Sequence, residues 1–166
     1  MSILPAETLA EAAALLKLLE ARGLTLATAE SCTGGLIAGA LTAIAGSSSV
    51  VMCGFVTYSN QAKQRMLGVP YSVLEGSGAV SDTVARRMCE GARREGQVDL
   101  AVSCTGIAGP GGATPGKPVG LVQLGLASAA GTQAVRRVFP GDRNAVRAAT
   151  VAEAFRLIRE ALTPPR

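Results

Sequence analysis

Hydrophobic positions recur along the chain at two spacings, one typical of amphipathic helices and one typical of strands. Leu9, Leu16 and Leu19 share one face of a helix that Pro5 opens and Gly23 ends. Short runs of apolar and β-branched residues between glycine-rich or polar clusters are typical of strands. The pattern predicts helices over residues 6–21, 33–44, 61–67, 81–95 (capped by Ser81) and 143–162 (capped by Asp142), and strands over residues 24–29, 50–58, 100–104, 119–127 and 133–139.

The order of these elements indicates one α/β domain over residues 1–166. Helices and strands interleave at first, and a hairpin around Gly131 and one helix follow. This order predicts a three-layer α/β/α sandwich whose sheet is mainly parallel with an antiparallel edge. A length of 166 residues suits one domain, and 48% hydrophobic with 17% charged residues excludes a disordered chain.

No charged residue occurs between Ser31 and Ala62. A membrane helix needs about 18 or more consecutive apolar residues, and residues 46–49 divide this stretch, so we expect a buried helix, a buried strand and no membrane span. The first residues do not resemble a signal peptide, so we expect a cytoplasmic protein. Gly35 and Gly39 predict close packing of the helix backbone, and the uncharged, glycine-rich surfaces favour a homo-oligomer.

The composition narrows the chemistry. The chain contains no histidine, which excludes Ser-His-Asp triads, Cys-His dyads and zinc sites built on imidazole. Carboxylates do not cluster as a divalent metal would require, so neither a metal nor another cofactor is expected. The net charge of +4 resides in scattered arginines and aromatic residues are scarce, so nucleic-acid binding is not favoured. The cysteines have no CxxC spacing and are expected to be buried free thiols: Cys32, Cys53, Cys89 and Cys104.

Three segments place glycines and polar side chains directly after predicted strands, where ligands bind in open α/β sheets. In the first, Ser31 stands at a strand-to-helix turn and is a candidate nucleophile, with Cys32 as a rival. The alternative is that Ser31 is only an N-cap, as Thr33 could also be. Glu30 should point away from Ser31, so a solvated or structural role is predicted for it. The helix start offers N–H groups to an oxyanion or a phosphate, and its candidate binding residues are Thr33, Gly34 and Gly35.

The second segment runs from Tyr58 to Lys63 and opens the next helix. Lys63 is one of only three lysines in a chain that otherwise uses arginine. Lysine loses its proton near pH 7 if burial lowers its pKa, whereas arginine does not. Lys63 is therefore a candidate general base, with help from Tyr58. The alternative is a surface lysine at a helix start.

The third segment is a glycine-rich loop after the third strand. Gly111, Gly116 and Lys117 imitate the spacing of a nucleotide-binding P-loop, but Pro118 offers no hydroxyl to magnesium and a strand follows instead of a helix. A loop that shapes a small-molecule pocket is the better reading, with a mere long turn as the alternative. The candidate binding residues here are Thr105, Gly106, Gly109, Gly111 and Gly112.

Together these segments resemble the CinA C-terminal domain family, also called PncC. The motifs are AESCTGG at residues 29–35, YSNQAK at 58–63 followed by LGV, then GAVS, TGIAGPGG and KPVG, in the family's order from about Leu24 to Leu162. The resemblance implies a three-layer α/β/α fold. It also implies a nicotinamide-nucleotide amidase, which hydrolyses nicotinamide mononucleotide to nicotinic acid mononucleotide and ammonia in pyridine nucleotide salvage. Many relatives carry a larger preceding domain, so this chain is expected to be the stand-alone form.

The resemblance implies roles for single residues as well. Ser31 corresponds to the family's nucleophile, Lys63 to its base and Tyr58 to its tyrosine, and such a Ser-Lys amidase needs no histidine. The oxyanion donors are expected among the backbone N–H groups near Gly34, Thr105 and Gly106. The substrate phosphate is expected at the loop of residues 109–112 and at Arg147 on the last helix.

A second function stays open beside the amidase. The chain would then be a non-catalytic module that binds a nucleotide or a protein partner, in keeping with the family's historic names, which refer to competence and DNA damage. Release of ammonia from nicotinamide mononucleotide discriminates the two, because only the amidase produces it.

Overall fold

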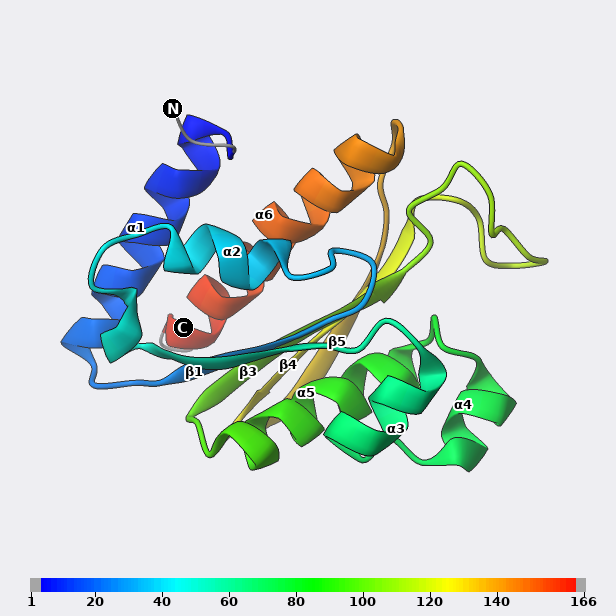
Figure 1. Cartoon of the computed structure of the whole chain (residues 1–166), viewed down its shortest axis with the longest axis horizontal. Coiled ribbons are helices and arrows are strands. Elements are labelled where there is room, and N and C mark those ends of the chain that lie inside the picture. Colours follow the sequence, from blue (N-terminus) through cyan, green and yellow to red (C-terminus); the bar gives the residue numbers. More distant parts are fainter. Residues whose placement is uncertain (1–3, 164–166) are drawn as a thin grey trace.

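A computed structural model describes residues 4–163 and shows a five-stranded sheet with helices on both faces (Figure 1). The strand order is β2-β1-β3-β4-β5, in which β2, β1 and β3 run parallel and β4 and β5 follow as antiparallel neighbours. The predicted parallel sheet with an antiparallel edge is therefore confirmed. The strands are β1 (Leu26–Glu30), β2 (Val51–Val56), β3 (Leu100–Gly106), β4 (Leu121–Ser128) and β5 (Gly131–Val138).

The helices form two layers, as the three-layer prediction requires. In Figure 1, α1, α2 and α6 lie above the sheet, and α3, α4 and α5 lie below it. Each layer closes over its own apolar core, one containing Phe155 of α6 and the other Met88 of α5. The helices are α1 (Ala6–Ala21), α2 (Leu36–Thr42), α3 (Asn60–Leu67), α4 (Tyr71–Ser77), α5 (Asp82–Gly96) and α6 (Arg143–Leu162), with a short 3-10 helix η1 (Ser47–Ser49).

Local sequence signals set several of these boundaries. The predicted caps are confirmed, because Ser81 accepts a hydrogen bond from the backbone N–H of Val84 and Asp142 accepts one from Ala145. The helix predicted over residues 33–44 is shorter than expected. Residues 32–35 instead form turns in which Gly34 and Gly35 have φ angles of 59° and 102°, which L side chains adopt only under strain.

The close packing predicted at Gly35 and Gly39 is wrong for Gly39, where an added Cβ would meet nothing within 4 Å. At Gly35 an added Cβ would lie 3.4 Å from Val56, an ordinary contact distance. A close approach between helices occurs instead at Gly91 of α5, where an added Cβ would lie 2.1 Å from the carbonyl oxygen of Leu67 at the end of α3. Helix α4 was missed, because its seven residues after Pro70 are too few to show a helical period.

The topology brings three strand ends to one place. The chain leaves β1 through α2 to reach β2 on one side, and returns through α3, α4 and α5 to β3 on the other side of β1. Such a change of direction leaves a crevice at the carboxyl ends of the strands, where ligands bind. Ser31 follows β1 there and Thr57 follows β2.

Three further observations concern membrane spans, metal ligands and cysteines. Within residues 4–163 no helix combines the length and apolarity needed to cross a bilayer. The same residues hold no cluster of potential metal ligands. The four cysteines are free, and all are buried except the half-buried Cys53.

Candidate active site

The end of β1 and the start of α3 bring a serine and a lysine into direct contact. Lys63 Nζ donates hydrogen bonds to Ser31 Oγ at 2.9 Å and to the carbonyl oxygen of Thr57 at 2.8 Å. The carbonyl oxygen of Tyr58 lies at 3.4 Å from the same nitrogen. Lys63 is only 1% exposed. It contacts Ser31 although the two residues are 32 positions apart in the sequence. The surface-lysine alternative is therefore wrong.

The surroundings of Lys63 favour its neutral form. Burial lowers the pKa of its amine, because the charged form loses its hydration, and this effect outweighs the opposing influence of Cys104 and Cys32. No ion pair to Lys63 occurs among residues 4–163, so no carboxylate offsets that effect. An amine with a lowered pKa, hydrogen-bonded to a hydroxyl, can accept the hydroxyl proton and thereby activate the oxygen as a nucleophile.

A cavity of about 210 Å³ opens beside this pair. Ser31 and Lys63 line it together with Tyr58, Gly106 and Arg143, so five elements or turns contribute to it. No aspartate or glutamate lies among its lining residues. The cavity is therefore suited to a ligand whose reacting group is uncharged and which carries an anionic group elsewhere.

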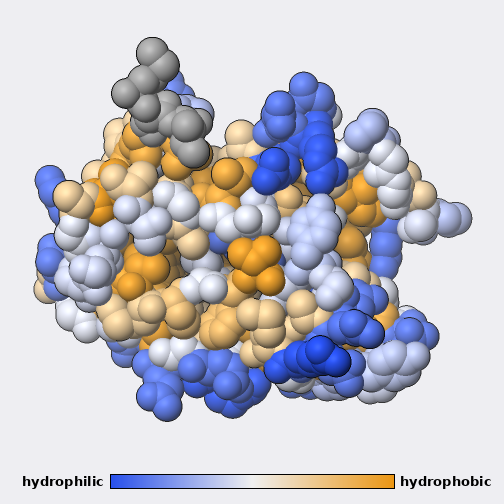
Figure 2. All heavy atoms as spheres, viewed as in Figure 1, coloured by the Kyte–Doolittle hydropathy of each residue, from blue (hydrophilic) through white to orange (hydrophobic). Residues whose placement is uncertain are grey.

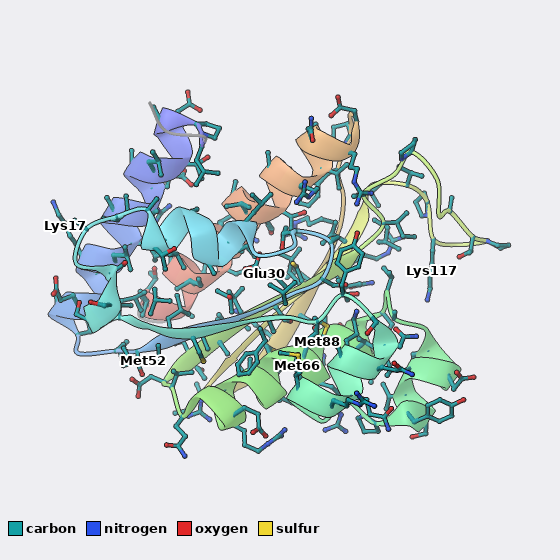
Figure 3. The ribbon with its side chains drawn as sticks, in the orientation of Figure 1. Lys17, Glu30, Met52, Met66, Met88 and Lys117 are labelled. Atoms are coloured by element: carbon teal, nitrogen blue, oxygen red, sulfur yellow. The ribbon has the colours of Figure 1, made fainter. Side chains whose placement is uncertain are left out.

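Glu30 is buried on the other face of the sheet from Ser31, where it lies beneath α2 (Figure 3). Its carboxylate accepts hydrogen bonds from the backbone N–H groups of Ile37 at 2.8 Å and Ala38 at 3.0 Å, and from Thr33 Oγ1 at 2.6 Å. The structural role predicted for Glu30 is correct and the solvated one is wrong. These N–H groups are consequently not free for a ligand.

Other backbone N–H groups near Ser31 can serve an oxyanion. The N–H of Gly34 is taken by the carbonyl of Ser31, but no described residue accepts a hydrogen bond from the N–H groups of Cys32 or Thr33. The backbone groups of Cys104 point toward β1, since its carbonyl accepts a hydrogen bond from the N–H of Ser31. Because strand backbone groups alternate between edges, the N–H of Gly106 points the same way, past the end of β1.

The hydroxyl of Tyr58 takes part in a different contact from the one expected. Tyr58 is 61% exposed, and its hydroxyl oxygen accepts a hydrogen bond from Arg143 Nη2 at 3.1 Å. Its backbone carbonyl, not its hydroxyl, contacts Lys63. Arg143, which sequence reasoning missed, also donates from Nη1 to the carbonyl of Gly109 at 2.8 Å.

Arg147 lies outside the lining of this cavity. Its Nε donates to the carbonyl of Cys32 and its Nη2 to the carbonyl of Thr33, both at 3.1 Å. It therefore holds the turn that follows Ser31. Among the other predicted binding residues, Thr105 lines the cavity and donates from Oγ1 to the carbonyl of Ala79. The cavity is not lined by Thr33, Gly34, Gly35, Gly109, Gly111 or Gly112.

Cys32 remains the rival nucleophile by position, because it also lines the cavity. A hydrogen bond with the thiol of Cys104 lowers the pKa of Cys32, against the opposing effect of burial. The same hydrogen bond and burial raise the pKa of Cys104. Lys63, however, donates a hydrogen bond to the hydroxyl of Ser31, so the serine is the nucleophile candidate that contacts the base.

Comparison with known proteins places the chain in a known family. The family model described as the CinA C-terminal domain matches residues 8–162. The CinA-like protein of Anaeromyxobacter sp. (strain K) is 53% identical over 144 residues, which are 87% of this chain and 35% of that protein. The CinA-like protein of Geobacter sulfurreducens is 50% identical over 149 residues, 90% of this chain and 36% of that protein. The chain thus spans about a third of the length of these relatives.

Solved structures agree over nearly the whole chain. The competence/damage inducible protein CihA from Agrobacterium tumefaciens superposes with a TM-score of 0.92 at 46% identity, covering 98% of this chain and 99% of that one. A competence-damaged protein (CinA) superfamily protein from Escherichia coli superposes with a TM-score of 0.90 at 34% identity, covering 96% and 94%. The sheet and its two helical layers are therefore those of these proteins.

Proposed function

Because the chain belongs to the CinA C-terminal domain family, we propose that it is an amidohydrolase acting on nicotinamide mononucleotide. The products would be nicotinic acid mononucleotide and ammonia. The observation that carries the proposal is the 2.9 Å hydrogen bond between Ser31 Oγ and the buried Nζ of Lys63, beside a cavity free of carboxylates. A serine with a lysine base is one of the known arrangements for nucleophilic attack on an amide.

The first half of the reaction forms an ester on the enzyme. Ser31 Oγ attacks the carboxamide carbon while the neutral amine of Lys63 takes the hydroxyl proton. The negative charge that develops on the carbonyl oxygen is held by backbone N–H groups, for which Cys32, Thr33 and Gly106 are the candidates. The C–N bond then breaks, and protonated Lys63 gives its proton to the leaving nitrogen, which departs as ammonia.

The second half releases the acid by the same groups in reverse. A water molecule attacks the ester carbon and gives its proton to neutral Lys63. The bond to Ser31 Oγ breaks, and Lys63 returns the proton to that oxygen. Throughout, the carbonyl oxygens of Thr57 and Tyr58 keep the lysine nitrogen directed at Ser31.

The test compares purified wild type with Ser31→Ala and Lys63→Ala for ammonia and nicotinic acid mononucleotide formed from nicotinamide mononucleotide. We expect a loss of about 1000-fold or more for Ser31→Ala and at least about 100-fold for Lys63→Ala. The exposed Ser72 and Lys17 supply matched controls, since Ser72→Ala and Lys17→Ala remove the same groups away from the cavity. Both control variants should retain wild-type rates.

Cys32→Ala separates the two nucleophiles. If Ser31 is the nucleophile, this variant keeps most of its activity, because Cys32 then contributes only its backbone N–H. Loss of activity in Cys32→Ala with activity kept in Ser31→Ala would transfer the role to the thiol. Tight binding of the nucleotide by wild type without any ammonia would favour the non-catalytic binding module.

A further inference from the structure

One cation at the mouth of the cavity has no charged partner. Arg143 is the first residue of α6 and forms no ion pair with any residue in the described range 4–163, whereas Arg86, Arg137 and Arg156 each pair with a carboxylate. Its guanidinium donates instead to two neutral oxygens, the carbonyl of Gly109 and the hydroxyl of Tyr58. The remaining N–H donors of its planar fork form no hydrogen bond with residues 4–163.

Arg143 is the residue at the cavity that stays positively charged throughout the reaction. Lys63 must be neutral to act as a base, and burial lowers its pKa accordingly. Asp142 precedes Arg143, but its carboxylate accepts the N–H of Ala145 at 2.9 Å and caps the helix. Glu30 lies on the opposite face of the sheet. A ligand that fills the cavity therefore contacts, at the rim of the cavity, one guanidinium whose charge no carboxylate neutralises.

We propose that Arg143, together with the Tyr58 hydroxyl, forms a subsite for a phosphate monoester carried by the substrate. A guanidinium fork matches the geometry of phosphate oxygens and binds them through charge-assisted hydrogen bonds. The carbonyl of Gly109 and Tyr58 hold the fork over the cavity that contains Ser31. Arg147 cannot do this without giving up the carbonyls of Cys32 and Thr33.

The inference rests on the proposed amidase and deepens it. It assigns the Ser31–Lys63 pair to the amide and Arg143 to the phosphate, so the two ends of one substrate are recognised by separate groups. The class of substrate follows: an amide that carries a phosphate monoester is selected over the same amide without the phosphate.

The test measures discrimination between nicotinamide mononucleotide and nicotinamide riboside, which lacks the phosphate. We expect Arg143→Ala to lower the ratio of the two kcat/KM values by at least about 10-fold, the effect of losing one charge-assisted hydrogen bond. Arg143→Lys keeps the charge but loses the fork, so its ratio should lie between those of wild type and Arg143→Ala. An unchanged ratio in Arg143→Ala overturns the proposal, even if both kcat/KM values fall, because a general loss of structure affects both substrates alike.

Arg136→Ala is the matched control, since it removes the same charge from the exposed face of β5. A ratio that falls equally in Arg136→Ala and Arg143→Ala would show a long-range effect of net charge and would also overturn the proposal. The wild-type ratio in Arg136→Ala, with a lowered ratio in Arg143→Ala, supports it.

A binding measurement keeps this inference separate from the amidase. Titration calorimetry on Ser31→Ala and on Ser31→Ala/Arg143→Ala, with nicotinamide mononucleotide and with ribose 5-phosphate, requires no turnover. If wild type fails to release ammonia, the amidase is wrong, but an at least 10-fold weaker binding of either phosphate in the double variant still supports the subsite. Absence of binding to both probes, or equal binding by the two variants, overturns it.

Discussion

At the scale of single residues, the buried amine of Lys63 links activity to pH. Burial lowers its pKa below the ordinary value of 10.5, and the neutral form is the one that accepts the Ser31 proton. We expect kcat/KM to rise with pH through this lowered pKa and then to level off. Rate measurements on nicotinamide mononucleotide across the pH range will check this. Lys63→Arg should be inactive at every pH, since arginine keeps its proton.

The same residue makes stability depend on pH. Between the lowered pKa of Lys63 and 10.5, the unfolded chain binds a proton that the native protein does not, so the free energy of unfolding rises with pH in that window. The rise should be about 1.4 kcal/mol for each unit by which the pKa is lowered. Urea unfolding of wild type and Lys63→Met from neutral pH to pH 10 measures it. Parallel pH profiles for the two proteins would contradict this prediction.

At the scale of elements, Glu30 fixes where α2 begins. Two N–H groups of α2 and the hydroxyl of Thr33 converge on its buried carboxylate. Glu30→Gln places an amide NH₂ against one of these donors, so we expect a loss of about 1–3 kcal/mol in the free energy of unfolding. Urea unfolding measures it, with the exposed Glu7→Gln as control. Equal stabilities of the two variants would mean that α2 does not depend on this carboxylate.

Two glycines give a matched pair for helix packing. Alanine at Gly91 would bring its Cβ against the Leu67 carbonyl, so α3 and α5 must separate and we expect a loss of about 2 kcal/mol or more. Alanine at Gly39 meets nothing and suits a helix interior, so a gain of up to about 1 kcal/mol is expected. Thermal unfolding of both variants distinguishes the signs. A loss at Gly39 would show a contact that the space around it does not reveal.

The elements also show what a sequence can and cannot predict. Helix α1 and the caps at Ser81 and Asp142 follow from local signals, and the structure confirms them. Ser31 and Lys63 could be placed at two strand ends, but only the fold brings them to 2.9 Å. Arg143 and Arg147 are four residues apart and share one helix face, so only the packing of α6 decides which one reaches the cavity.

At the scale of the whole molecule, the two edges of the sheet differ. Edge strand β5 carries Arg136 and Arg137, and charges on an edge discourage pairing with another chain. Edge strand β2 carries no charge, and Met52 and Val56 on it are each 46% exposed. Figure 2, which faces the β2 edge, shows apolar residues across the middle of the molecule, with strongly hydrophilic residues gathered below them and at the upper right.

We therefore propose that a second copy of the chain pairs with β2, because two uncharged edges meet without repulsion. Met52, labelled in Figure 3, is the second residue of β2, whereas Lys63 contacts the carbonyl of Thr57, just past the other end of the strand. Met52→Lys should convert a dimer to a monomer in sedimentation velocity and leave kcat unchanged. Val138→Lys, on the opposite edge, should remain dimeric. A wild type that sediments as a monomer at micromolar concentrations would rule out this pairing.

The alternation of side chains at the end of β1 restricts how the chain can vary in length. Glu30 serves the layer above the sheet and Ser31 the layer below, so one residue inserted into β1 would exchange the two layers that these side chains face. The exposed loop that carries Lys117 extends away from the sheet (Figure 3), and a Cβ added at Gly111 or Gly116 meets nothing. Natural and engineered insertions should thus be tolerated in that loop and rejected in β1.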